Sequence, residues 1–309
     1  MIVVCGEALI DFLPVKSADG RDAYRPAVGG SPFNTAVGIG RLGGPVGFCG
    51  GLSTDFFGDS LADALERSRV SLRYVSRANR PSMLAFVSLG DGEPHYAFVD
   101  DASANRLFDP ERDAPAILPE VSMLQFGSVA LINDPIASAY EKLFFDNKHH
   151  RVLGLDPNVR PTVVSDPADY RARMKRMTEA ADIIKISKVD LLWLDATLDP
   201  DGWARGLVHK GASLVVITDG GNGATGYGRG FSMKRPVAHV DHVVDTVGAG
   251  DSYCSGLLYT LQRHGVLELD KLSGLNETVA REAMDYAART AAITVSREGA
   301  DPPWDHEMA

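Results

Sequence analysis

The sequence predicts a three-layer α/β fold, with helices on both faces of a mostly parallel central sheet and a small additional sheet. Short β-branched runs alternate with helical patterns along the 309 residues, which is the rhythm of βαβ units. Hydrophobic residues make up 45% and charged residues 23%, as in an average soluble globular chain. Two segments, 11–28 and 82–99, break the rhythm with strand-like patterns around polar turns.

The elements of the main sheet follow from the apolar runs. We expect strands at 2–4, 46–49, 123–126, 152–155, 183–186 and 214–218, and helices at 31–42, 59–68, 252–262 and 280–294. Ligand sites in open parallel sheets lie beyond the carboxyl ends of the strands. The Gly-rich and polar clusters that follow these strands should therefore gather at one edge.

The two irregular segments are expected to form a small sheet that covers the active site. The first holds a polar turn at 17–20, and the second centres on the sequence GDGE at 90–93, a strong hairpin signal. The alternative, which is the default for a hairpin taken alone, is a pair of edge strands without a function. If the sheet is a lid, its strands should present one apolar face, with Leu84, Phe86 and Phe98 as candidates.

The net charge limits the possible binding partners, and the cysteines indicate the redox environment. The formal net charge of -10 argues against nucleic acid and anionic membranes as partners. Cys5, Cys49 and Cys254 form no C-x-x-C pair, so we expect packed, reduced thiols. No signal peptide or membrane-length apolar run is evident, so we expect a cytoplasmic protein.

The segment 245–251, with the sequence DTVGAGD, carries the chemistry. Gly248 and Gly250 allow a tight turn, so that the backbone N–H groups of Gly248, Ala249 and Gly250 can form an anion hole at a helix N-terminus. Asp251 beside that hole suits a general base for an attacking hydroxyl. The alternative is an N-cap aspartate after a Gly-rich turn. The chain has no P-loop sequence, and the Gly38-x-Gly40 spacing lacks the third glycine of a dinucleotide fingerprint.

These motifs together resemble the ribokinase-like (PfkB) carbohydrate kinases. Segment 245–251 resembles the family's C-terminal signature, and GGSPFNTA at 29–36 with RLG at 41–43 resembles its N-terminal signature. GEALID at 6–11 resembles the opening strand, DPNVRP at 156–161 is typical of fructokinases and 2-keto-3-deoxygluconate kinases, and TDGGNGA at 218–224 occupies the place of the nucleotide-binding turn. The resemblance implies one ribokinase-like kinase domain over 1–309, with a lid formed by about 12–28 and 82–99.

The resemblance also implies the sugar-side residues. Asp11, Asn34 and the backbone of Gly29 and Gly30 should hydrogen-bond sugar hydroxyls, and Phe98 and Arg160 should also bind the substrate. Taken singly, Asp11 fits a turn residue, Asn34 a helix start and Arg160 a surface cation.

On the nucleotide side, the resemblance implies ATP and Mg²⁺. Thr218, Gly220 and Gly223 should flank the phosphates and ribose, and Lys185 should lie near the phosphates unless it is a surface cation. The adenine pocket should lie beside the helix 280–294, where Ala288 replaces an asparagine of the family. Ser187 and Asp190 replace the first and last residues of the family's Asn-x-x-Glu motif, and the shorter Asp190 favours a water-mediated contact with Mg²⁺.

The family's monovalent-cation site has matching positions here. They are Asp245, Val247, Thr294, Arg297 and Gly299, mostly through carbonyl groups, and they predict K⁺ binding. Pro303 replaces a hydroxyl residue, so the site is expected in a weaker form. The alternative for Asp245 is a loop cap.

The expected activity is phosphorylation of D-fructose at O6 by ATP. The runner-up substrate is 2-keto-3-deoxygluconate, whose carboxylate Arg160 could meet, and ribose or a nucleoside is third. A non-catalytic sugar- or nucleotide-binding regulator is the alternative from another class, against which the presence of Asp251 argues. We expect a homodimer that forms through the lids.

Overall fold

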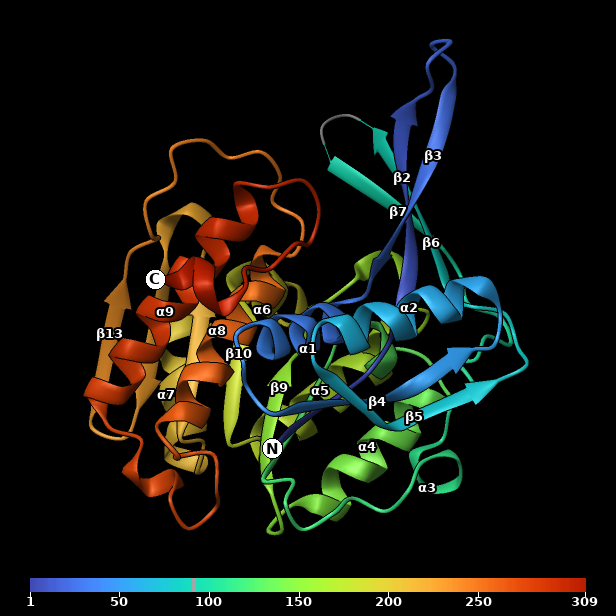
Figure 1. Ribbon diagram of the computed structural model, residues 1–309. Coiled ribbons are helices and arrows are strands. Elements are labelled where there is room, and N and C mark those ends of the chain that lie inside the picture. Colours follow the sequence, from blue (N-terminus) through green and yellow to red (C-terminus); the bar gives the residue numbers. More distant parts are fainter. Residues whose placement is uncertain (91–92) are drawn as a thin grey trace.

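The computed structural model describes residues 1–90 and 93–309, and this part of the chain forms a nine-stranded and a four-stranded sheet (Figure 1). The strand order in the larger sheet is β13-β12-β11-β10-β9-β8-β1-β4-β5. Its strands are β1 (Ile2–Cys5), β4 (Val46–Ser53), β5 (Val70–Ala78), β8 (Met123–Gly127), β9 (Val152–Asp156), β10 (Ile183–Ser187), β11 (Leu214–Thr218), β12 (Ala224–Gly228) and β13 (Phe231–Arg235). All neighbours from β5 to β11 pair in parallel, whereas β12 and β13 form an antiparallel edge. The predicted strands are confirmed.

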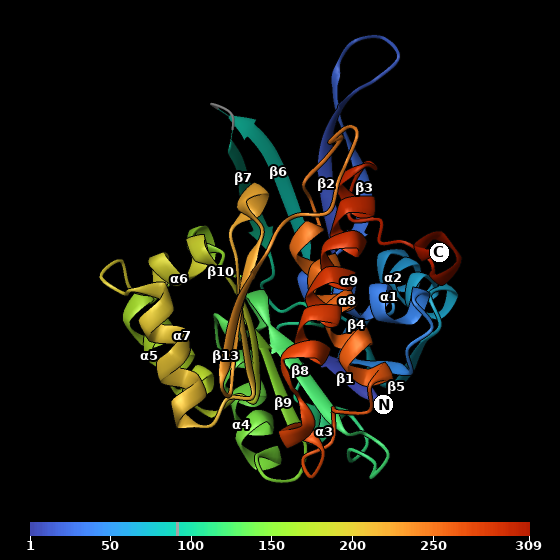
Figure 2. The ribbon, with the colours of Figure 1, turned by 90° about the vertical axis from the view of Figure 1, so that its left-hand side faces the viewer.

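Helices cover both faces of this sheet, as predicted (Figure 2). They are α1 (Ser31–Arg41), α2 (Phe56–Arg67), α3 (Pro110–Asp113), α4 (Ile136–Asn147), α5 (Pro167–Ala180), α6 (Lys188–Leu194), α7 (Pro200–Lys210), α8 (Ala249–Arg263) and α9 (Glu277–Val295). Helices α1, α2, α8 and α9 pack on one face, and α4, α5 and α7 on the other. None of the helices in residues 1–90 and 93–309 is long and apolar enough to cross a bilayer.

Three helices begin three residues before their predicted starts. Asp55 caps α2 by accepting the Gly58 N–H, and Asn276 caps α9 by accepting the Val279 N–H. Gly248 occupies the N-cap of α8. The predicted starts lie one turn inside each helix, because the caps at Asp55, Gly248 and Asn276 were not recognised in the sequence.

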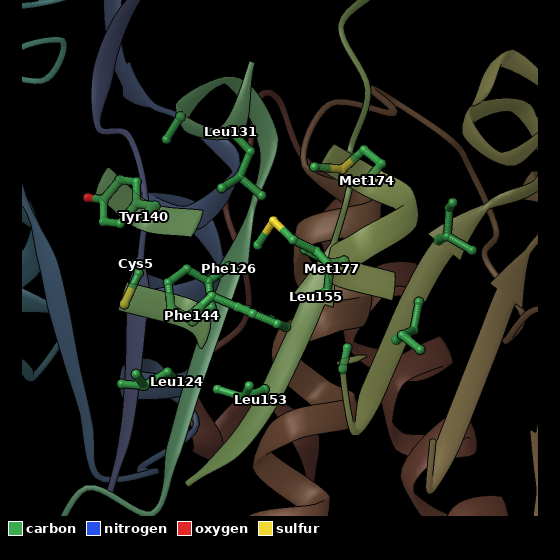
Figure 3. Close-up of a cluster of buried hydrophobic side chains, with 14 of the residues drawn as sticks. Cys5, Leu124, Phe126, Leu131, Tyr140, Phe144, Leu153, Leu155, Met174 and Met177 are labelled. Atoms are coloured by element: carbon green, nitrogen blue, oxygen red, sulfur yellow. The ribbon is translucent and has the colours of Figure 1, made fainter. Parts of the chain in front are cut away.

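The strands alternate their side chains between two apolar layers. Cys5 and Phe126 point into the layer beneath α4, α5 and α7, where they pack near Tyr140 and Phe144 (Figure 3). Ile2 and the other alternate residues pack into the layer beneath α1 and α8. All three cysteines are buried, free thiols, which confirms their predicted state.

The sheet reverses its strand order at β1. The chain proceeds from β1 to β4 and β5 on one side, and later adds β8 to β11 on the other side. Such a switch point leaves a crevice beyond the carboxyl ends of the flanking strands, where open α/β sheets bind ligands. Glu7 follows β1 and Ser128 follows β8, so both lie at this crevice.

The two irregular segments form one small sheet, as predicted. Its strands are β2 (Leu9–Lys16), β3 (Asp22–Gly29), β6 (Leu84–Gly90) and β7 (Glu93–Val99), in the order β3-β2-β6-β7. The sheet projects from the main body beyond α1 and α2 (Figure 1). The predicted hairpin is present as the antiparallel β6–β7 pair, and residues 91 and 92 of its turn lie outside the described residues.

One prediction about this sheet is wrong: Phe98 does not share a face with Leu84 and Phe86. Ala85 pairs with Phe98, and Leu84 pairs with Val99. Residues that are directly opposite share a face, so even-numbered residues of β6 lie with odd-numbered residues of β7. The face of Phe98 depends on the pairing register, which the sequence alone does not give.

The two faces of the small sheet have different character. Phe12 stacks on Phe86 with ring centroids 4.7 Å apart, and Tyr24 meets Phe86 edge-on, so this face is aromatic. Asp11 pairs with Ala85, which places Asp11 and Phe98 together on the opposite face.

Candidate active site

The Asp251 carboxylate lies where three segments of the chain converge. It accepts hydrogen bonds from Ser31 Oγ at 2.6 Å, Asn34 Nδ2 at 2.9 Å and Asn158 Nδ2 at 3.1 Å. Asp251 is only 6% exposed and belongs to the first turn of α8. The N-cap position is held by Gly248, with φ 74° and no side-chain cap. Asp251 is therefore not the helix cap, and its carboxylate faces the polar groups of the site.

The backbone around these donors explains their placement. Gly30 has φ 106°, and a Cβ there would lie 2.9 Å from the Glu7 carbonyl oxygen, so a glycine is needed where α1 begins. Asn158 has φ 40°, a left-handed conformation that asparagine tolerates better than most residues. These two positions turn the chain so that Ser31, Asn34 and Asn158 point at one carboxylate.

A buried ion pair lies beneath the N-terminus of α8. Lys185 Nζ is 2.9 Å from Asp156 Oδ2, and both side chains are buried. A Cβ on Gly250 would lie 3.1 Å from that Nζ, so the ammonium closely approaches the helix. Burial raises the pKa of Asp156 to about 6, although Lys185 opposes the rise. Burial lowers the pKa of Lys185, but Asp156, Cys254 and Asp251 together raise it above its ordinary value, so the lysine stays protonated at neutral pH.

A second acidic group faces the site from the small sheet. A Cβ on Gly29 would lie 2.3 Å from Asp11 Oδ2, so Gly29 makes room for this carboxylate. Burial raises the pKa of Asp11 to about 7; Arg160 lowers it, while Asp251 and Glu7 add to the rise. Glu7 is itself buried and accepts the Ala130 N–H at 3.0 Å. Asp251 and Glu7 therefore both lie close enough to Asp11 for their charges to raise its pKa.

Arg160 is the cation on this side. Its guanidinium donates to the carbonyls of Asn158 at 3.4 Å and Val159 at 3.2 Å, and it remains partly exposed. Its charge opposes the rise in the pKa of both Asp11 and Glu7. Arg160 therefore lies near enough to both carboxyl groups for its charge to affect them.

A cavity of about 630 Å³ adjoins the other side of the α8 N-terminus. It is lined by Thr218, Gly220, Gly221, Gly223, Ala224, Pro236, Val237, Ala238, His239, Val240, Val243, Thr246, Ala249, Gly250, Tyr253, Ala288, Ala291, Ala292 and Val295. Four of the residues predicted to bind nucleotide therefore share a cavity with two residues of the predicted anion hole.

Two predicted nucleotide residues do not line this cavity. Lys185 lies beneath α8 in the ion pair with Asp156. Ser187 caps α6, because its Oγ accepts the Asp190 N–H at 3.0 Å. Asp190 nevertheless lies near enough to add to the rise in the Asp156 pKa.

The predicted monovalent-cation positions also converge. Asp245 Oδ1 accepts the Val247 N–H at 3.0 Å, and Oδ2 accepts the Gly299 N–H at 2.9 Å. The side chains of the other two are engaged elsewhere: the Thr294 hydroxyl donates to Ser252 Oγ, and Arg297 pairs with the carboxylates that follow it. Backbone carbonyls are therefore the groups that remain for a cation between these loops.

A family model for pfkB family carbohydrate kinases matches residues 1–307. The chain belongs to the pfkB family. The predicted family and the predicted ribokinase-like fold class are thereby confirmed.

Individual relatives agree with this assignment. A fructokinase from Rhizobium leguminosarum bv. trifolii is 39% identical over 285 residues, which cover 92% of this chain and 87% of the relative. The crystal structure of a fructokinase with bound ATP from Xylella fastidiosa has a TM-score of 0.87 at 28% identity, covering 97% of this chain and 93% of that chain. A double-mutant fructokinase from Vibrio cholerae O395, in the fructose, ADP and potassium ion bound form, has a TM-score of 0.82 at 26% identity, covering 97% and 93%.

Within this pfkB-family site, sequence reasoning missed four residues. Ser31 and Asn158 hold the Asp251 carboxylate, Asp156 pairs with Lys185, and Glu7 is buried at the switch point. All four stood inside the quoted family motifs without an assigned role. A polar residue shortly after a buried strand, such as Glu7 after β1, was the available signal.

Proposed function

We propose that the protein is an ATP-dependent fructokinase that phosphorylates D-fructose at O6 and releases ADP. The observation that carries the proposal is the Asp251 carboxylate, held by Ser31, Asn34 and Asn158 between the Asp11 side of the site and the large cavity. The choice of fructose is supported by the fructokinases to which the chain is similar.

In the proposed reaction, Asp251 takes the proton of the attacking hydroxyl. Its three donors hold the carboxylate in place before the substrate arrives, which lowers the cost of orienting it. First-turn N–H groups of α8, which have no intrahelical partner, would meet the charge that develops on the transferring phosphoryl group. Lys185 lies beneath this turn and adds positive potential.

Sugar recognition is assigned to the face that carries Asp11. Its carboxylate and the backbone of Gly29 and Gly30 would bind hydroxyls, and Phe98 lies on the same face. Asn34 already donates to Asp251, so we assign its amide to positioning the base as well as to the sugar.

Mg²⁺ would be held mainly by nucleotide phosphates and water, as is usual for this ion. Asp156 Oδ1 is buried, and among the described residues it finds no hydrogen-bond partner, which fits a water of a hydrated cation. Asp190 is the second carboxylate on that side. Mg²⁺ would supply charge neutralisation for the phosphates.

The loops around Asp245 fit a K⁺ bound by carbonyls. The Val244 N–H donates to the Val295 carbonyl at 2.8 Å, and the Asp245 carboxylate ties the Val247 and Gly299 backbones together. The potassium-bound relative supports the choice of ion. K⁺ would stiffen the loop that precedes α8.

We further propose that residues 1–309 are one kinase domain in which the four-stranded sheet acts as the lid. Closing the lid would exclude water, which otherwise competes with the sugar as phosphoryl acceptor. The aromatic face of the lid is partly exposed: Tyr24 is 49% and Val99 is 53% exposed. We therefore propose a homodimer that buries this face, and a cytoplasmic protein whose free thiols match a reducing compartment.

The second candidate substrate is 2-keto-3-deoxygluconate. It is supported by Arg160, which is partly exposed near Asp11. Among the described residues, its guanidinium donates to two backbone carbonyls, at the long distances of 3.4 and 3.2 Å. A planar guanidinium suits a substrate carboxylate.

A coupled ADP-release assay with fructose, 2-keto-3-deoxygluconate, ribose and adenosine tests the proposal. The highest kcat/KM is expected with fructose. If kcat/KM were at least tenfold higher with 2-keto-3-deoxygluconate, that compound would replace fructose as the proposed substrate. Absence of turnover with all four compounds, combined with measurable ADP binding, would instead favour a non-catalytic binding protein.

A further inference from the structure

Glu7 is a buried carboxylate at the carboxyl end of β1, beside the proposed active site. It is 1% exposed. Its Oε2 accepts the Ala130 N–H at 3.0 Å, and the Ser128 side chain also hydrogen-bonds it. Such donors offset the hydration that a buried carboxylate loses. Both donors belong to the short turn that follows β8, so Glu7 fastens that turn to the end of β1.

The turn that Glu7 holds is strained. Ser128 has a φ of 65°, in the left-handed region that only glycine enters without a steric penalty. Residues in such conformations persist where neighbouring contacts hold them, and they cluster at functional sites. The hydrogen bonds between this turn and Glu7 are contacts of that kind.

The same turn is joined to the segment that carries Asn158. The Ser128 N–H donates to the Pro157 carbonyl at 3.2 Å. A Cβ on Gly127 would lie 2.1 Å from the Asp156 carbonyl oxygen, so the ends of β8 and β9 are in close contact. Asn158 also has a left-handed φ, of 40°. The carbonyl that Ser128 binds belongs to the peptide group that precedes Asn158, and the orientation of this group sets the φ of Asn158.

Asn158 connects these contacts to the proposed base. Its Nδ2 donates to Ser31 Oγ at 2.8 Å and to Asp251 Oδ1 at 3.1 Å. A rotation of the peptide group before Asn158 would move this amide away from the carboxylate. Asp251 would then keep Ser31 and Asn34 as donors, so its orientation would become less exact without being lost.

We propose that Glu7 is a positioning residue, which holds the turn at Ser128 and thereby keeps the Asn158 amide against Asp251. The inference rests on the proposed function, because it takes Asp251 as the base. The effect of Glu7 on the rate is indirect, since it acts through the turn and Asn158. Displacement of a reacting group by about 1 Å can lower a rate about 100-fold, so an indirect effect of this kind is measurable.

The first test replaces the carboxylate by an apolar chain of similar length. Glu7→Met cannot accept the Ala130 N–H, and kcat is expected to fall about 10- to 100-fold with an unchanged Kd for ADP. The matched control is Asp182→Leu, because Asp182 Oδ2 accepts the Leu153 N–H at 2.8 Å at the amino ends of β9 and β10, opposite to the site. The control should lower the Tm and leave kcat normal. An equal fall in kcat in both variants, or none in Glu7→Met, would overturn the inference.

A double-mutant cycle decides whether Glu7 acts through Asn158. Asn158→Gly removes the amide but still adopts the left-handed backbone conformation. In this background Glu7→Met should lower kcat by less than about 3-fold, because the contact that it disturbs is already gone. Equal fold-changes in both backgrounds would show independent roles and contradict the inference. Should Glu7→Met not fold, Glu7→Asp takes its place, since its carboxylate is one methylene short of the turn; a normal kcat in that variant counts against the inference.

A second pair of variants tests the strain at position 128. Glycine adopts a φ of 65° without the penalty of a Cβ, so Ser128→Gly should restore part of the kcat lost in Glu7→Met. Ser128→Ala removes the same hydroxyl but keeps the Cβ, and it should restore none. Equal kcat values in the two double variants would rule out the turn as the link.

The inference and the proposed function fail in different ways. Failure of the unmodified protein to phosphorylate fructose would overturn the proposed substrate alone, and the cycle would be measured with the acceptor that is used. A normal kcat in Asp251→Asn would overturn the proposed base together with the inference. A normal kcat in Glu7→Met, with a low kcat in Asp251→Asn, would overturn the inference alone.

Discussion

At the scale of single residues, the Asp251 carboxylate is the first group to test. Asp251→Asn removes the basic oxygen and turns an N–H toward one of the three donors that now point at it. We expect kcat to fall about 10²- to 10⁴-fold, the usual contribution of a general base, with ADP affinity nearly intact. Asp63→Asn, on the exposed side of α2, is the control. A near-normal kcat would remove Asp251 from the mechanism.

The raised pKa of Asp11 predicts that the KM for fructose depends on pH. Burial raises its pKa to about 7, with Asp251 and Glu7 adding to the rise and Arg160 opposing it. Below pH 7 the carboxyl group is protonated and accepts sugar hydroxyls less well. We expect the KM for fructose to fall about tenfold as the pH rises from 6 to 8, since the ionised fraction grows by that factor. In Asp11→Asn this slope should disappear, and a KM that increases with pH would contradict the assignment.

The Asp11 carboxyl group also makes the free energy of unfolding decrease as the pH rises. Between its ordinary pKa and about 7, the folded protein keeps a proton that the unfolded chain releases. The contribution of Asp11 to the free energy of unfolding is therefore present at low pH and is lost as the pH rises through about 7. Urea unfolding at several pH values should show a smaller decrease over this window in Asp11→Asn.

At the scale of elements, the turn that starts α8 depends on Gly248. Its φ is 74°, and a Cβ would lie 2.5 Å from the Ala300 Cβ. Gly248→Ala should lower the free energy of unfolding by about 1–3 kcal/mol and should also lower kcat, because the anion-binding turn must shift. Gly265→Ala is the matched control, with φ 68° but open space around the added methyl. It should show backbone strain alone, with normal kcat.

The loops joined by Asp245 predict an ion effect. Their carbonyls should favour K⁺ over Na⁺. The rate in K⁺ should be several-fold higher than in Na⁺, but K⁺ should not be strictly required, because Pro303 supplies no hydroxyl. Titration with KCl and NaCl at fixed ionic strength measures this. Equal rates in both salts and in a bulky organic cation would leave Asp245 with only its hydrogen bonds to Val247 and Gly299.

The elements themselves were largely predictable. Strands such as β10 and β11 are buried β-branched runs, so their composition reveals them. The face occupied by Phe98 was not predictable in the same way, because it depends on the pairing register across the β6–β7 turn.

At the scale of the whole molecule, the exposed aromatic face of the small sheet predicts assembly. Val28 is 36% and Val99 is 53% exposed beside the ring cluster of Phe12 and Phe86. We expect a dimer in sedimentation velocity at micromolar concentration, and a monomer after Val99→Glu. The control is Val189→Glu, at an exposed position of α6 away from this sheet. A monomeric unmodified protein would contradict the proposed interface.

The site was only partly predictable, because it is a property of the assembled molecule. The motif around Asp251 led to the proposal of a general base, but it did not indicate which side chains hold the carboxylate. Ser31, Asn34 and Asn158 lie 220, 217 and 93 positions away from it along the chain. No local pattern encodes contacts over such separations; the strand order and the packing of α1 against α8 create them.

This separation has a consequence for the newly made protein. A ribosome completes β1, β2 and α1, with Ser31 and Asn34, long before it reaches Asp251. Until α8 emerges and packs beside α1, the growing chain has hydroxyl and amide donors but no carboxylate between them. On the proposed mechanism, a chain that ends before α8 has no base for the sugar hydroxyl, so partly synthesised copies would not spend ATP on the sugar.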